Sequence, residues 1–127
     1  MKLLVIVMIS MLAIASSNQC DLLPDGDYKM KYNRSSESTN MLIKSGRFYL
    51  YHGPDSIKGG ITQLKPCLFM LRYDHEGRNK HDRKRIRTYG HHCIEVQKKS
   101  GDTIFIRTTN SKQLDVTIDE GYFLKQR

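Results

Sequence analysis

The chain contains no tryptophan, few cysteines and, beyond its first fifteen positions, no long apolar run. Three cysteines among 127 residues are too few for a disulfide-dense scaffold, so the fold must depend on a hydrophobic core. No later segment keeps apolar residues at helical spacing, which argues against a helical bundle. The Gly-x-Ser-x-Gly, His-Glu-x-x-His and phosphate-loop motifs are also missing, so the usual positive evidence for an enzyme is absent.

The start of the chain has the pattern of a secretory signal peptide. Met1 and Lys2 are followed by thirteen uncharged, mostly aliphatic residues, and the small side chains near the end of this run favour cleavage after Ala15 or Ser17. The run is too short for a stable membrane span, so no transmembrane segment is expected. We therefore predict a signal peptide over residues 1–17 and one secreted domain over residues 18–127.

The charge balance is basic. The formal net charge is +8, and loss of Lys2 with the signal peptide lowers it to +7. A secreted domain with this excess is attracted to acidic surfaces such as sulfated glycans, anionic lipid, nucleic acid or an acidic protein. The alternative is that the charge only keeps a small domain in solution.

Alternation of apolar and polar residues recurs along the predicted domain and indicates β-strands. It is clear in four segments, of which the last is the most regular: residues 28–32, 47–51, 103–107 and 113–118. We count roughly nine or ten short strands at the spacing typical of all-β domains. The prediction is a single small antiparallel β-barrel or sandwich.

Turn residues separate these segments. Gly46 and Gly101 suit the positive φ angles of tight hairpins, and Gly59-Gly60 is expected to belong to a further loop. Residues 67–71 are apolar at every position, which predicts the most deeply buried strand.

Two similar phrases suggest an internal repeat. Gly46-Arg47-Phe48-Tyr49-Leu50 is echoed by Gly121-Tyr122-Phe123-Leu124, about 75 residues later. Residues 45–50 and 111–116 resemble hairpin segments of β-trefoil lectins and growth factors, although the chain has no tryptophan where lectin repeats usually carry one. The resemblance implies a β-trefoil-like arrangement of the strands.

The most basic stretch is residues 78–87, where six of ten residues are permanently cationic. Its second half is expected to be a strand that places Arg83, Arg85 and Arg87 on one face, about 6.6 Å apart. Such a row of guanidinium groups can bind successive sulfates or phosphates, whereas the alternatives are a solvated loop or a processing site. The candidate anion-binding residues are Arg78, Lys80, Arg83, Lys84, Arg85 and Arg87.

The leading hypothesis is therefore a secreted, non-enzymatic protein that binds a sulfated glycan or another polyanion, with an acidic protein as a further candidate partner. A second hypothesis is a barrel that holds a small apolar ligand in a cavity lined by Phe48, Leu50, Phe69 and Met70.

A third hypothesis is a secreted nuclease that uses histidines as acid and base while cations bind phosphate. The candidate histidines are His75, His81, His91 and His92. Their spacing matches no specific zinc-ligand pattern, so neither a metal nor another cofactor is expected.

Three cysteines and one sequon suggest covalent modifications. An odd number of cysteines permits one pair, for which we favour Cys67 with Cys93, leaving Cys20 free or available for an intermolecular disulfide. Asn33 begins an Asn-Arg-Ser sequon in a polar stretch and is the candidate N-glycosylation site.

Overall fold

The computed structural model describes residues 23–52 and 55–127, without the side chains of His52 and Asp55. The predicted signal peptide and Cys20 lie outside the described residues. The described part of the chain contains eight strands and one helix: β1 (Gly26–Tyr32), β2 (Ser38–Lys44), β3 (Arg47–His52), β4 (Asp55–Lys65), β5 (Leu68–Tyr73), α2 (Lys80–Tyr89), β6 (His92–Ser100), β7 (Thr103–Asn110) and β8 (Asp119–Lys125).

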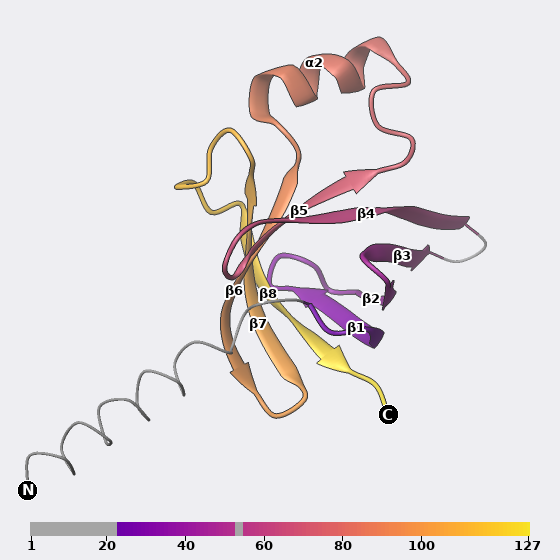
Figure 1. Cartoon of the computed structure of the whole chain (residues 1–127), viewed down its shortest axis with the longest axis vertical. Helices are drawn as coiled ribbons and strands as arrows, with labels where there is room; N and C mark the ends of the chain where they lie inside the picture. The colour runs from indigo at the N-terminus through magenta and orange to yellow at the C-terminus, as the bar shows by residue number, and fades with distance from the viewer. Residues whose placement is uncertain (1–22, 53–54) are drawn as a thin grey trace, which may run out of the picture.

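The strands close into one antiparallel barrel (Figure 1). Each strand pairs with the next in sequence, and β8 pairs back with β1, so that Met30 lies opposite both Thr39 and Phe123. This order confirms the predicted all-β fold and the barrel. It excludes the sandwich and the β-trefoil-like arrangement, because one ring of sequential hairpins has no threefold repeat. The described strands number eight, fewer than expected.

The two ends of the barrel differ in their connections (Figure 1). At one end, two-residue turns join β2 to β3, β4 to β5 and β6 to β7. Ser45 and Gly46 have φ angles of 52° and 76°, and Gly101 has 60°, as the predicted hairpin turns require. At the other end the connections from β1 to β2, from β5 to β6 and from β7 to β8 are longer, and the one between β5 and β6 contains α2. We call these the turn end and the helix end.

Large apolar side chains fill the barrel from the turn end to about its middle. The rings of Tyr28 and Phe123 meet with centroids 6.2 Å apart, and the Tyr28 hydroxyl donates to the Pro24 carbonyl at 2.7 Å. Complete burial of one such side chain stabilises the fold by about 1.5–3 kcal/mol. The filled core contains Tyr28, Ile43, Phe48, Phe69, Ile94, Ile104, Ile106 and Phe123.

The prediction of a loop at Gly59-Gly60 is wrong, because β4 runs through both glycines. A Cβ atom at Gly59 would lie 2.0 Å from the Arg72 carbonyl oxygen and 2.8 Å from the Phe48 ring. At Gly60 a Cβ atom would meet nothing within 4 Å. Gly59 therefore permits a close approach of β4 to β5 and to the core, which is a common role of glycine within strands.

The prediction of a regular strand at residues 113–118 is also wrong. The segment is a loop between β7 and β8, in which the Val116 N–H donates to the Gln113 carbonyl at 3.1 Å. Arg107 holds this loop by donating to the Leu114 carbonyl at 3.0 Å. Val116 is 50% exposed, so the alternation here does not correspond to a buried face.

The basic segment forms α2 instead of the predicted strand. The Asn79 side chain caps the helix by accepting a hydrogen bond from the Asp82 N–H at 2.7 Å, and Asp82 stands in the first turn, where a carboxylate is favoured by the helix dipole. Gly90, with a φ angle of 85°, ends the helix, and its N–H donates to the Ile86 carbonyl at 2.8 Å.

The cysteines do not form the predicted bridge. Cys93 is a free, fully buried thiol, so a Cys67–Cys93 disulfide is excluded and that prediction is wrong. Cys93 lies opposite Met70 within the β5–β6 ladder, whereas Cys67 belongs to the turn before β5. Burial raises the pKa of the Cys93 thiol to about 11, which keeps it protonated and unreactive.

Candidate functional site

A pocket opens into the barrel at its helix end. Its volume is about 630 Å³, which lies within the usual range of small-molecule sites. Six strands contribute to its wall, together with the β1–β2 connection and the segment that carries α2. The lining residues are Met30, Tyr32, Ser35, Thr39, Met41, Leu50, Ile57, Leu71, Tyr73, His75, Glu76, Asn79, His81, Asp82, Arg85 and His92.

The floor of the pocket is apolar and belongs to the barrel. Met30, Met41, Leu50 and Leu71 are buried side chains that lie between the filled core and the pocket. They expose hydrocarbon and thioether groups to the pocket, so this part of the site suits the apolar portion of a ligand.

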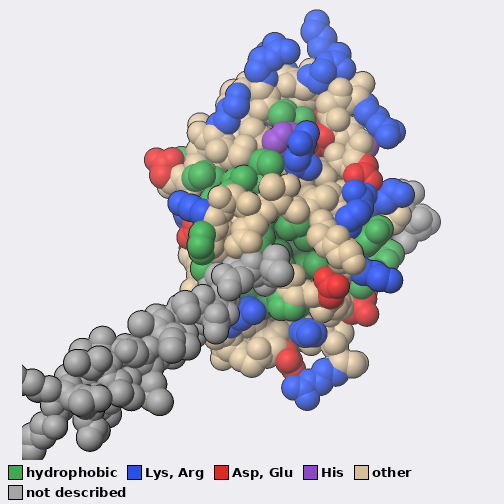
Figure 2. Space-filling model, in the orientation of Figure 1, with side chains coloured by type: hydrophobic (Ala, Val, Ile, Leu, Met, Phe, Trp, Pro, Cys, Tyr) green, Lys and Arg blue, Asp and Glu red, His purple; other side chains and the backbone are tan. Residues whose placement is uncertain are grey.

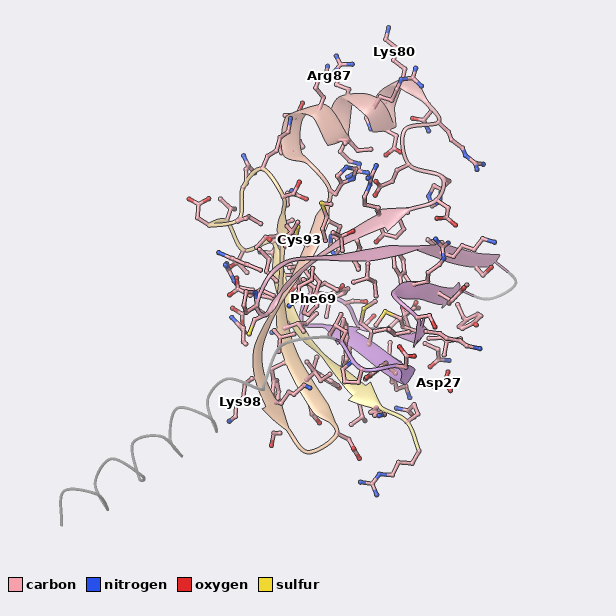
Figure 3. The ribbon with its side chains drawn as sticks, in the orientation of Figure 1. Asp27, Phe69, Lys80, Arg87, Cys93 and Lys98 are labelled. Atoms are coloured by element: carbon pink, nitrogen blue, oxygen red, sulfur yellow. The ribbon has the colours of Figure 1, made fainter. Side chains whose placement is uncertain are left out.

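The predicted cavity residues are only partly correct. Leu50 lines the pocket, but Phe48 and Phe69 belong to the filled core, where Figure 3 shows Phe69 near the middle of the barrel. Met70 alternates with the inward-facing Phe69 and Leu71 and therefore lies on the other face of β5.

The rim of the pocket is polar, and it contains an internally paired arginine. Arg85 donates to Asp82 Oδ1 from Nε at 3.2 Å and from Nη2 at 2.9 Å. The Gly77 N–H donates to Asp82 Oδ2 at 2.7 Å. The Gly77 hydrogen bond, followed by the Arg85 guanidinium, lowers the pKa of Asp82. The carboxylate therefore stays ionised and holds Arg85 at the rim.

The Glu76 side chain lies in the wall of the pocket and is only 7% exposed. Its Oε2 atom lies 2.6 Å from His91 Nδ1. Its Oε1 atom is buried and has no hydrogen-bond partner among the described residues. A buried polar atom without a partner costs about 1–3 kcal/mol, so Glu76 marks a position where a donor would be stabilising.

Other titratable groups gather at the same end of the barrel. Burial, and then the charge of Glu76, raises the pKa of Tyr73. Burial, and then the charge of Arg85, lowers the pKa of His92. His92 lines the pocket with His75 and His81, so three of the four histidines of the nuclease hypothesis are brought together there. The fourth, His91, contacts Glu76.

Four of the six predicted anion-binding residues share the outer face of α2. Lys80, Arg83, Lys84 and Arg87 have the spacing of one helix face and line a surface depression of about 380 Å³. Figure 3 shows Lys80 and Arg87 pointing away from the barrel, and Figure 2 shows basic side chains over α2. We call these four residues the cationic face. The prediction that Arg83, Arg85 and Arg87 form an extended row along a strand is wrong, because these residues belong to α2.

The other two predicted anion-binding residues lie apart from the cationic face. Arg85 belongs to the pocket rim, and Arg78 is exposed in the connection before α2. Lys112, from the β7–β8 loop, donates from Nζ to the Arg87 carbonyl and so joins this loop to the end of α2.

Asn33, the predicted glycosylation site, is exposed in the connection between β1 and β2. Its neighbours Tyr32 and Ser35 line the pocket, so a glycan on Asn33 would stand near the pocket entrance. The structure is therefore compatible with the sequon, and its occupancy stays a prediction.

Glu76 and Asp82 are functional candidates that the predictions from the sequence did not include. A signal for Glu76 is present, because the polar run of residues 74–76 directly follows the buried strand β5. Polar side chains at the end of a buried strand often lie at the mouth of a barrel. The signal for Asp82 is its spacing from Asn79, which is typical of a helix start.

No family model matches this chain, and neither the curated proteins nor the solved structures contain a match to it. Within residues 23–52 and 55–127, no group of three histidine, cysteine or acidic side chains is placed to hold a metal ion. No helix in the same residues is long and apolar enough to cross a membrane. The pocket and the cationic face are therefore the two features of the described residues that bear on function.

Proposed function

We propose that this protein binds a small molecule with an apolar body in the pocket at the helix end of the barrel. The observation that carries the proposal is a volume of about 630 Å³ left open above a tightly filled core. An eight-stranded barrel is wide enough either to fill itself with side chains or to hold one small ligand. At its turn end this barrel is filled with side chains, and at its helix end it has room for a small ligand.

The chemistry of the wall supports the proposal. The floor formed by Met30, Met41, Leu50 and Leu71 removes apolar ligand surface from water, which is worth about 25 cal/mol per Å². The polar rim provides groups that can orient the ligand. Together with the predicted signal peptide, this arrangement favours an extracellular binding protein without a catalytic step.

Pocket filling by mutation tests the proposal. The neutral dye N-phenyl-1-naphthylamine should bind the wild-type protein with one-to-one stoichiometry and gain fluorescence. Met41→Trp places an indole in the pocket and should weaken dye binding at least about tenfold, because the floor is then occupied. Phe105→Trp is the matched control, since Phe105 is 39% exposed and does not line the pocket.

The wild-type chain has no tryptophan, so each variant carries a single indole group, and its fluorescence also reports folding. Absence of dye binding by the wild-type protein, or equal binding by the two variants, would contradict the proposal.

A second function is favoured by the cationic face of α2. We propose that Lys80, Arg83, Lys84 and Arg87 bind a polyanion such as a sulfated glycan, because four cations lie side by side on an exposed helix face. Arg85 is not included, since Asp82 neutralises it.

Charge-matched variants test this second function. Changing the four residues of the cationic face to Gln should strongly reduce retention on heparin and keep the helix, because Gln is a good helix former. The control changes four exposed lysines on the barrel, which removes the same charge: Lys65, Lys98, Lys99 and Lys125. Equal losses in the two variants would show that net charge alone, and not the helix face, governs retention.

A further inference from the structure

We infer that the pocket selects a small amphipathic cation, whose protonated amine pairs with Glu76 while its apolar body lies on the floor of the pocket. This inference rests on the proposed function, because it names the class of ligand for the same pocket.

Glu76 provides the charge and an open position for a donor. Its side chain is 93% buried, it lines the pocket, and its Oε1 atom has no hydrogen-bond partner among the described residues. His91 reaches only the other oxygen, Oε2, at 2.6 Å. An ammonium group is suited to this position, because charge-assisted hydrogen bonds to a carboxylate are stronger than neutral ones, above all in a buried site.

The rim disfavours a ligand with a carboxylate or phosphate group. Arg85 is the permanently cationic residue that lines the pocket, and Asp82 already accepts two hydrogen bonds from it. An anionic ligand would have to displace Asp82 and would approach the charge of Glu76. Asp82 and Arg85 are paired with each other, and His91 reaches only Oε2 of Glu76, so Glu76 Oε1 remains as the carboxylate oxygen with which a ligand can pair.

Tyr73 adds an aromatic surface beside Glu76. Its ring is held edge-on against Phe48, with centroids 5.2 Å apart, and it lies 5.8 Å from the His75 ring. Tyr73 lines the pocket, and the charge of Glu76 acts on its hydroxyl. A fixed tyrosine ring next to a carboxylate favours a cation further, since the face of an aromatic ring attracts positive charge. The floor, which includes Met41 and Leu50, is left for the apolar body.

Three probes of equal chain length and different charge test the inference. Octylamine, 1-octanol and octanoate should compete with the bound naphthylamine dye at pH 8 in this order of affinity, with the amine ahead of the alcohol by about tenfold to a hundredfold. Glu76→Gln keeps the shape of the side chain and removes its charge. In this variant the affinity for the amine should fall to that for the alcohol, while the affinity for the alcohol should change by less than about threefold.

Asp27→Asn is the matched control, because it removes one carboxylate that is exposed and lies away from α2 (Figure 3). It should leave all three affinities unchanged, and thermal melts should show that both variants fold. If the three probes bind equally, or if Glu76→Gln does not weaken the amine, the cation inference is wrong while the pocket proposal stands. If neither the dye nor any probe binds, the proposed function fails and the inference fails with it.

Discussion

The turn end and the helix end of the barrel are built from the same eight strands but are filled differently. Short turns and large buried side chains, such as Phe123 with no exposed surface, close the turn end. At the helix end the strands carry methionine, leucine and tyrosine around an open volume, and long connections bring Glu76 and Asp82 to its rim. The packed core and the open pocket, which is the proposed ligand site, therefore lie at opposite ends of one barrel.

This division has a physical reason. A buried ring that contacts core side chains on all sides gains dispersion and hydrophobic energy, whereas a side chain that borders a pocket lacks partners on one side. The helix end can therefore accept polar and charged residues that the filled end would not tolerate. Four predictions test the comparison.

The largest loss of stability is expected when a side chain in the filled end of the barrel is shortened. Phe123→Ala should lower the free energy of unfolding by about 3–5 kcal/mol, because it leaves a cavity in a packed core. Leu50→Ala should cost about 2 kcal/mol, at the low end of the range for buried leucines, since Leu50 already faces the pocket on one side. Urea unfolding monitored by circular dichroism measures both values, and equal losses would show that the two ends are packed alike.

A neighbouring pair of glycines tests the boundary between the core and the pocket. Gly59→Ala should destabilise the barrel by about 1–3 kcal/mol, because its Cβ atom would clash with the Arg72 carbonyl and the Phe48 ring. Gly60→Ala has open space and should be neutral or stabilising by up to about 1 kcal/mol. Thermal and urea unfolding will show which of the two variants is less stable. If Gly60→Ala is less stable than Gly59→Ala, the close approach of β4 to β5 at Gly59 is contradicted.

The helix end should also be sensitive to acid through His92. Because burial lowers the pKa of His92 in the folded state, the unfolded chain binds a proton first as the pH falls. The stability contributed by neutral His92 is thus complete above its unfolded pKa of about 6.5, and it is lost as the pH falls from there toward the lower folded pKa. His92→Gln should make the melting temperature fall less between pH 7.5 and pH 5. An identical fall in the variant would exclude His92 as a cause.

The smallest effect is expected at Cys93. The native protein should leave this thiol unmodified by iodoacetamide at pH 8, since it is buried and its pKa is raised to about 11. With Cys93 free, an intramolecular disulfide of this chain can only join Cys20 and Cys67. Peptide mapping after alkylation distinguishes these states, and a peptide that links Cys67 to Cys93 would contradict the structure.

The sequence predicted the fold better than the site. Alternation around residues 28–32 and 103–107 identified true strands, and Gly46 and Gly101 identified true turns, because both signals are local. The same reasoning failed at residues 113–118, where alternation occurs in an exposed loop, and at α2, where the Asn79 and Gly90 capping signals outweigh the alternating arginines.

The pocket could not be predicted from local patterns. Met41, Leu71 and Tyr73 look like ordinary strand residues, and the space between them depends on how strands distant in sequence meet around the barrel. The role proposed for Glu76 depends in the same way on which side chains do and do not reach its two oxygens. The pocket and the contacts of Glu76 depend on the closed barrel as a whole and not on any single segment.

Nuclear magnetic resonance can show whether a ligand occupies the helix end of the barrel. In a titration of the ¹⁵N-labelled protein with the neutral naphthylamine dye, the amide signals of Tyr32, Tyr73 and Glu76 should shift together and saturate at one equivalent. The signals of Gly46 and Gly101 at the turn end should stay in place. Shifts at the turn end, or no saturable shift at the helix end, would show that the pocket is not the binding site.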